Sequence, residues 1–178
     1  MIMSWNDFYQ RRDILEAALR QAGHHPSDAI SLEAIPGATK YFATEEELLL
    51  ALRYKWNQVF AGHLRAEMTD PDYADQDLAL DRVEAVTRAW NSATAEHETL
   101  RAVLDAALER CPALIPSHEA ELRTLALTAG LADGNEPAGE ITKVGSAFAT
   151  LLRHGRHAKP ARRRSPMGHL LRLLAPSA

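Results

Sequence analysis

The 178-residue sequence has little cysteine, few aromatic residues and no long apolar run. Cys111 is the single cysteine, which excludes an internal disulfide and a zinc site built from several cysteines. The longest apolar run is Leu48 to Leu52, whereas a helix that crosses a bilayer needs about 20 apolar residues. The N-terminus lacks the apolar core of a signal peptide. These absences predict a cytoplasmic protein.

Motifs of the common catalytic and cofactor-binding sites are also missing. The nine glycines are scattered, so they form neither a P-loop nor a dinucleotide-binding fingerprint. No two of the eight histidines have the four-residue spacing of a helical zinc site. Cys111 precedes a proline at the end of a predicted helix, which indicates a structural thiol. We therefore predict no catalytic residue, no cofactor and no metal.

What the sequence has in abundance is alanine, leucine, glutamate and arginine, which lose little side-chain freedom in a helix. No useful stretch alternates between apolar and polar residues as a strand would. The sequence predicts an all-α bundle of five to seven helices. We divide it into a helical domain over 1–152, with a small head-like region at 1–44 and a body at 45–152, and a tail at 153–178.

Apolar residues at helical spacing place the first two long helices. The first starts at a Ser4 cap, carries an apolar stripe and is expected to stop at a left-handed Gly23. The second starts at a capping box of Thr44 and Glu47 and ends near Met68. The stripe of the first comprises Trp5, Phe8, Ile14, Leu15, Ala18 and Leu19.

The remaining helices lie in the second half of the chain. A helical region covers about 77–110, and the polar interval 94–99 divides it into two helices. We expect Ser117 to cap the following helix and Gly130 to end it. A final apolar stripe runs from Ile141 to Leu152.

Three segments resemble the TetR family of bacterial regulators. "RRDILEAAL" is similar to the opening helix of the family, and "KYFATEEELLLAL" to the junction between its DNA-reading helix and the long connecting helix. "DRVEAVTRAWNSATAEHETLRAVLDAAL" has the texture of the ligand-binding and dimerising body. The resemblance implies a head with a helix-turn-helix, a helical body and a homodimer.

The junction also supplies the candidate DNA contacts, Thr39, Lys40 and Tyr41. In the family pattern a tyrosine and a lysine on either side of the phenylalanine bind phosphates. Set on Phe42, those places hold Thr39 and Glu45, and a carboxylate repels a phosphate. Residues 1–60 hold eight acidic and six basic side chains, so they offer no excess of positive charge for DNA. We interpret the head as shortened and degenerate.

Aromatic residues on the predicted inward stripes mark the candidate ligand pocket. A pocket for a small apolar ligand between helices would use such side chains, and ordinary core packing would use them equally well. Both interpretations require burial. The residues are Trp56, Phe60, Trp90 and Phe148.

The chain is unevenly charged, because residues 1–152 hold 13 basic and 24 acidic side chains, whereas 153–178 hold seven basic and no acidic ones. Prolines and glycines in the tail predict disorder. Its last apolar residues could form a short helical face for a protein partner or an anionic membrane surface. The candidate tail contacts are Arg162, Arg163, Arg164, Leu170, Leu171 and Leu174.

The leading interpretation is a non-enzymatic regulatory or interaction protein with a TetR-like body. The first alternative is a working DNA-binding repressor of the TetR type. The second alternative is a peripheral membrane or partner-bound accessory protein that acts through its basic tail.

Overall fold

A computed structural model of the chain describes residues 5–23, 25–68 and 78–155, and all regular secondary structure in these ranges is helical. The prediction of an all-α bundle with five to seven helices is confirmed, because the described residues form seven α-helices and one 3-10 turn. In chain order they are α1 (Trp5–Ala22), α2 (Ala38–Tyr41), α3 (Glu45–Met68), α4 (Leu78–Glu96), α5 (Glu98–Ala107), the 3-10 turn η2 (Pro112–Leu114), α6 (Ile115–Thr128) and α7 (Ala138–Gly155).

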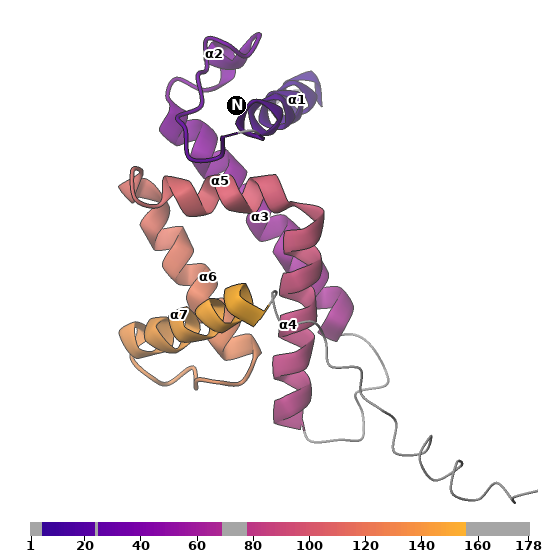
Figure 1. Ribbon diagram of the computed structural model, residues 1–178, viewed down its shortest axis with the longest axis vertical. Coiled ribbons are helices and arrows are strands. Elements are labelled where there is room, and N and C mark those ends of the chain that lie inside the picture. The colour runs from indigo at the N-terminus through magenta and orange to yellow at the C-terminus, as the bar shows by residue number, and fades with distance from the viewer. Residues whose placement is uncertain (1–4, 24, 69–77, 156–178) are drawn as a thin grey trace, which may run out of the picture.

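The longest helix, α3, runs through the bundle and packs antiparallel to α4 (Figure 1). α5 crosses the end of α4, and α6 and α7 pack against each other as a crossed pair (Figure 1). α1 and α2 lie at the end of the bundle where α3 begins, and α1 packs against α5 and α3. In this arrangement α3 packs against α1, α4, α5 and η2.

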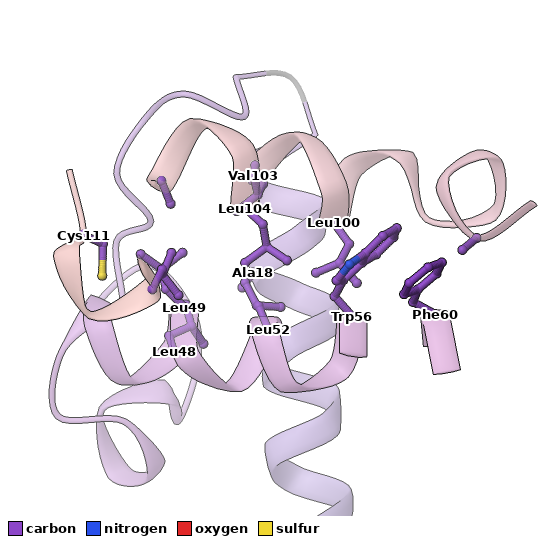
Figure 2. Close-up of a cluster of buried hydrophobic side chains, with 14 of the residues drawn as sticks. Ala18, Leu48, Leu49, Leu52, Trp56, Phe60, Leu100, Val103, Leu104 and Cys111 are labelled. Atoms are coloured by element: carbon purple, nitrogen blue, oxygen red, sulfur yellow. The ribbon is translucent and has the colours of Figure 1, made fainter. Parts of the chain in front are cut away.

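One continuous hydrophobic core joins α1 to the rest of the bundle. Ala18 of α1 faces Leu52 of α3 and Leu104 of α5, and Cys111 closes the cluster at one end (Figure 2). Trp56 and Phe60 extend the core along α3 (Figure 2). The described residues of the predicted head-like region therefore share their core with the body.

The predicted capping box at the start of α3 is confirmed. The Glu47 backbone N–H donates to the Thr44 hydroxyl at 3.2 Å. The Glu47 carboxylate accepts from the backbone N–H of Ala43 at 2.8 Å, one residue before the usual partner. Three glutamates in the first turn also match the positive end of the helix dipole.

The predicted division of residues 77–110 is confirmed as well, because α4 ends at Glu96 and α5 begins at Glu98. His97 leaves helical geometry, with φ −127° and ψ 46°. The change of direction at this residue turns α5 across α3, which places Leu100 and Leu104 in the core.

One predicted helix start is wrong, and one predicted helix end has a different conformation. Ser117 does not cap α6, because η2 leads directly into a helix that begins at Ile115. The Ser117 hydroxyl instead accepts a hydrogen bond from Arg53. Gly23 directly follows the end of α1, as predicted, but is not left-handed. Gly130 follows the end of α6, as predicted, and has φ 69°. Gly37, just before α2, is the other described glycine with positive φ.

The apolar stripe of α1 is divided between core and surface. Ile14 and Ala18 are buried, whereas the side chain of Trp5 is 80% exposed and that of Phe8 is 52% exposed. The first turns of α1 extend past the bundle, so no other described helix covers them (Figure 1). Large aromatic rings are consequently left on the surface beside α3.

α6 and α7 approach so closely that their backbones touch. A Cβ atom at Gly145 would lie 1.9 Å from the carbonyl oxygen of Leu122, well inside any van der Waals contact. Glycine is therefore required at this crossing. α7 continues to Gly155, three residues into the predicted tail. Among the described helices none combines the length and apolarity needed to cross a bilayer.

Candidate functional site

Aromatic and charged side chains gather at two places in the described structure. The first, here called the buried charge cluster, comprises Arg53, Arg101, Asp105 and Glu121, from α3, α5 and α6. The second, here called the aromatic groove, is an open groove of about 800 Å³ between α1 and α3. Its lining residues are Phe8, Arg11, Arg12, Leu15, Ala51, Tyr54, Lys55 and Gln58.

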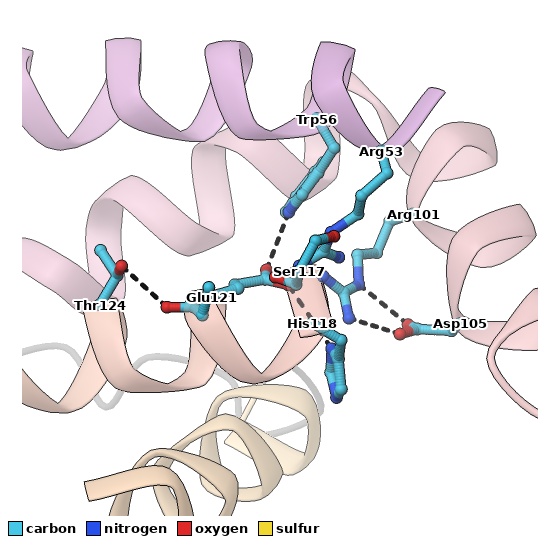
Figure 3. Close-up of polar contacts among 9 residues, drawn as sticks. Arg53, Trp56, Arg101, Asp105, Ser117, His118, Glu121 and Thr124 are labelled. Atoms are coloured by element: carbon cyan, nitrogen blue, oxygen red, sulfur yellow. Dashed lines mark hydrogen bonds and ion pairs between the residues drawn. The ribbon is translucent and has the colours of Figure 1, made fainter. Parts of the chain in front are cut away.

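Glu121 is the centre of the buried charge cluster (Figure 3). One carboxylate oxygen pairs with Arg53 of α3, and the other accepts from Arg101 of α5 at 2.8 Å. The second oxygen also accepts from the Trp56 indole N–H at 2.8 Å. The side chains of Arg53, Arg101 and Glu121 are each only 3% exposed. One carboxylate thus connects three helices.

The two arginines are satisfied by further partners. Arg53 donates to both the hydroxyl and the backbone carbonyl of Ser117, each at 3.0 Å. Arg101 forms a two-pronged pair with Asp105, one turn further along α5. Its guanidinium carbon also lies 4.8 Å from the ring centroid of Trp90. Such a cluster meets the requirement that buried charges be paired and hydrogen-bonded.

The surroundings of Glu121 shift its pKa strongly. Burial alone would raise the pKa, but His118 and the positive charges of Arg101 and Arg53 outweigh it and lower the pKa to about 2. His118 Nδ1 lies 3.7 Å from the carboxylate, beyond hydrogen-bond distance, so we assign most of the lowering to the arginines. Glu121 is therefore held as a fully engaged anion, which suits a structural role.

The pKa values of the two guanidinium groups in the cluster shift in opposite directions. Burial opposes the charge of both. Attraction by Glu121 and Asp105 nevertheless raises the pKa of Arg101, whereas the pKa of Arg53 is lowered by burial despite its pairing with Glu121. The two carboxylates that pair with Arg101 make it the better compensated of the two cations.

The aromatic groove has the opposite character. Tyr54, on the α3 wall, is 66% exposed, and Phe8, on the α1 wall, is about half exposed. Leu15 and Ala51 lie deeper, where they pack against the hydrophobic core. The lining contains three cations and no acid. An apolar floor with a positive rim is thus open to solvent.

The three cations of the groove differ in how they are engaged. Arg11 donates to the backbone carbonyl of Tyr41 at 3.2 Å and stacks 4.5 Å from the centre of the Phe42 ring. Arg12 pairs with its exposed neighbour Asp13 at 3.1 Å. Lys55 makes no ion pair or side-chain hydrogen bond with any residue that the structure describes. Lys55 is therefore the cation most available to a bound molecule.

The four predicted pocket residues are all buried, as both interpretations required. Trp56, Phe60 and Trp90 pack against one another, with the Phe60 and Trp90 ring centroids 5.6 Å apart. Phe148 joins the same core from α7. A smaller cavity of about 240 Å³ between α3 and α6 is bordered by Phe60 and Glu121. These contacts describe core packing.

Trp90 has a polar atom without a hydrogen-bond partner among the described residues. This atom is the indole nitrogen, which is buried. The ring nevertheless contributes to the buried charge cluster, because its face lies against Arg101.

The predicted DNA contacts lie on or beside the one-turn helix α2. Thr39 and Lys40 are exposed, and the Tyr41 hydroxyl donates to Asp7 at 3.3 Å. Between residues 25 and 44 the structure contains only this four-residue helix, where a helix-turn-helix requires two helices. Residues 25–44 accordingly hold only one turn of helix.

Glu45, which stands where the family pattern has a phosphate-binding lysine, has a structural use. Its carboxylate accepts from the backbone N–H of Ile30 at 2.9 Å and pairs with Arg110 at 2.8 Å. The residue thereby fastens the irregular segment before α2 to the start of α3 and to the end of the α5 region. A lysine at this position could not make either contact.

The candidate tail residues, Arg162 to Arg164 together with Leu170, Leu171 and Leu174, lie outside the described residues. Within the described ranges, no group of three or more histidine, cysteine, aspartate or glutamate side chains is arranged to hold a metal ion.

Sequence reasoning missed the aromatic groove. A partial signal was in "RYKW", where Tyr54 and Lys55 lie between Arg53 and Trp56. At 100° per residue, Tyr54 falls on the opposite face of α3 from the core stripe. A single exposed ring is common on protein surfaces, and it indicates a binding surface only where other exposed apolar groups lie beside it, which the sequence does not show.

These observations establish an all-α helical bundle with one open aromatic groove. Comparison of the chain with protein-family models, with curated proteins and with solved structures finds no match.

Proposed function

We propose that this protein is a non-enzymatic interaction protein that binds a helix of another protein in the aromatic groove. The observation that carries the proposal is the exposure of Phe8 and Tyr54 on facing walls of one groove. Rings of this size are normally buried, and exposed apolar patches rimmed by polar groups mark binding surfaces.

The spacing of the wall residues favours a helical partner. Ala51, Tyr54, Lys55 and Gln58 follow the i, i+3, i+4, i+7 pattern along α3. Phe8, Arg11, Arg12 and Leu15 follow the same pattern along α1. The two stripes border the groove from helices that cross each other (Figure 2), and each offers a ridge against which a third helix packs.

The energetics favour an occupied groove. An aromatic side chain offers roughly 150–250 Å² for burial, and each Å² of apolar surface removed from water contributes about 25 cal/mol. Covering the exposed parts of Phe8 and Tyr54 would therefore contribute on the order of 2 kcal/mol for each ring. These two rings would be the main contributors to affinity.

The remaining parts of the proposal come from the sequence. A regulatory role, a TetR-like body, homodimerisation and a cytoplasmic location rest on the resemblance and on the scarcity of cysteine. The non-enzymatic part is supported by Glu121, the carboxyl with the most strongly lowered pKa, whose two oxygens are both engaged by other side chains. DNA binding is left out, because residues 25–44 provide a single turn of helix.

The test is a selection of displayed helical peptides against the full-length protein. Recovered peptides are then measured by fluorescence anisotropy against the double variant Phe8→Ser, Tyr54→Ser. Loss of two central aromatic rings should weaken binding at least about 30-fold.

Leu151→Ser provides the matched control, because Leu151 is an exposed apolar residue of α7 away from the groove. This variant should bind the peptides as the wild type does. A selection that yields no peptide, or peptides that bind the double variant undiminished, would refute the proposed function.

A further inference from the structure

We infer that the partner of the aromatic groove is an acidic amphipathic helix, whose carboxylates flank its apolar stripe and are recognised by Lys55 and Arg12. This inference rests on the proposed function. It adds the charge of the partner, which the apolar surface of the groove does not specify.

The charges on the two walls carry the argument. Lys55 on α3 and Arg12 on α1 are both groove-lining cations, one on each wall. A helix seated between them would present one flank to each. Lys55 has no described ion partner, and Arg12 holds Asp13 and Glu16 only through exposed pairs. Exposed pairs contribute little to stability, so a partner's carboxylate can replace them readily.

The chain's own tail does not fit this groove. From Arg153 to Ala178 every charged side chain is cationic. Seating that segment would bring arginines against Lys55 and Arg12. Like charges placed opposite one another reduce affinity, so the groove selects against the tail.

An anionic membrane fits less well than a helix. Asp13 and Glu16 lie exposed on α1 beside the groove. A planar anionic surface would meet these carboxylates together with the cations, whereas a single helix would contact only the groove walls. Membrane-binding surfaces normally carry an excess of basic over acidic residues, and α1 has no such excess.

A second copy of the chain also lacks a suitable helix. Outside the residues that line the groove, the exposed large apolar residues that the structure describes are Trp5, Tyr9, Leu50, Met68, Ile115, Leu131 and Leu151. Trp5 and Tyr9 belong to the groove-forming helix α1 itself, and the other five form no stripe at helical spacing. Pairing of two grooves face to face would bring like charges together.

The experiment uses the tightest groove-dependent peptide from the selection. It is remade with glutamate, glutamine or lysine at the positions that flank its apolar stripe, and each version is titrated against the full-length protein. The glutamate version should bind about tenfold more tightly than the lysine version. Added salt should weaken the glutamate version alone, which a purely apolar contact would not show.

Charge reversal on the protein provides the second measurement. Lys55→Glu should remove most of the preference for the glutamate peptide, because the new carboxylate on the α3 wall opposes the attraction by Arg12 on the α1 wall. Lys143→Glu, on the exposed face of α7, is the matched control and should leave the preference unchanged. Both variants change the surface charge equally, so only the position differs.

The outcomes separate the two proposals. Equal binding of all three peptides overturns the acidic partner and leaves the helix-binding function standing. A selection without groove-dependent peptides overturns both. The acidic partner is also overturned if light scattering shows that the double variant Phe8→Ser, Tyr54→Ser dissociates a homodimer of the wild-type protein. It is overturned as well if the double variant no longer binds phosphatidylserine vesicles that the wild type binds. Competition for the groove by a peptide of residues 156–178 would have the same consequence.

Discussion

The buried charge cluster and the aromatic groove are built from the same kinds of residue and reach opposite states. In the cluster, Arg101 stacks on two tryptophans and every charge has a partner, with Arg53, Arg101 and Glu121 almost completely removed from water. In the groove, arginine and lysine border a phenylalanine and a tyrosine that face solvent. Both use α3, and both combine cations with aromatic rings. The difference is whether the partner of each group lies within the described chain.

The comparison is sharpest in the four residues 53–56. Arg53 and Trp56 are almost fully buried in the cluster, whereas Tyr54 is exposed and Lys55 lines the groove. Neighbouring residues on a helix point about 100° apart, so one short segment supplies two surfaces. Residue type therefore does not decide the role of these side chains, and their position around the helix does.

The largest expected effect is the removal of the central carboxylate. Glu121→Ala would leave Arg53 and Arg101 buried without their common anion, at a loss of about 3–5 kcal/mol in the free energy of unfolding. Urea denaturation followed by circular dichroism measures this loss. Glu119→Ala, on the exposed side of α6, is the control and should change stability by less than about 1 kcal/mol. Similar losses of stability for both variants would show that Glu121 contributes no more to stability than an exposed glutamate does.

A smaller effect should follow from acid. Because the pKa of Glu121 is lowered from 4.5 to about 2, its ionisation stabilises the fold above pH 4.5, and this stabilisation is lost as the pH falls towards 2. A shift of this size corresponds to about 3 kcal/mol. The stability gap between wild type and Glu121→Gln should therefore shrink across that interval in urea titrations. A gap that stays constant with pH would contradict the assignment.

The smallest effect belongs to the groove. Phe8→Ser and Tyr54→Ser remove rings that are 52% and 66% exposed, so each should lower the free energy of unfolding by about 1 kcal/mol, less than either change at Glu121. The same urea experiment measures it. A large loss at either position would mean that the rings support the fold, and the contrast between the two regions would disappear.

Local features of the fold could be predicted from the sequence because their causes lie within a few residues. Thr44 and Glu47 are three residues apart and satisfy the same helix end, and the polar interval around His97 interrupts an otherwise periodic pattern. The burial of Trp56 and Trp90 followed from their place on apolar stripes. Each inference needed only helical periodicity or capping chemistry.

Features that depend on distant residues could not be predicted. Arg53 and Glu121 are 68 positions apart, and nothing local shows that their side chains meet. The wrong assignment of Ser117 has the same origin, since its hydroxyl accepts from Arg53 instead of capping its own helix. Phe8 and Tyr54 face each other only because α1 packs beside α3. These contacts arise from packing, which a periodic pattern does not encode.

The backbone contact at Gly145 determines how α7 can move. Sliding α7 along α6 by one helical turn would bring Ile141 or Ala149 to the crossing, where the Leu122 carbonyl leaves no room for a Cβ atom. The pair therefore has a single allowed register and cannot act as a ratchet. Any motion that α7 transmits must be a rotation about this crossing or a movement of α6 and α7 together.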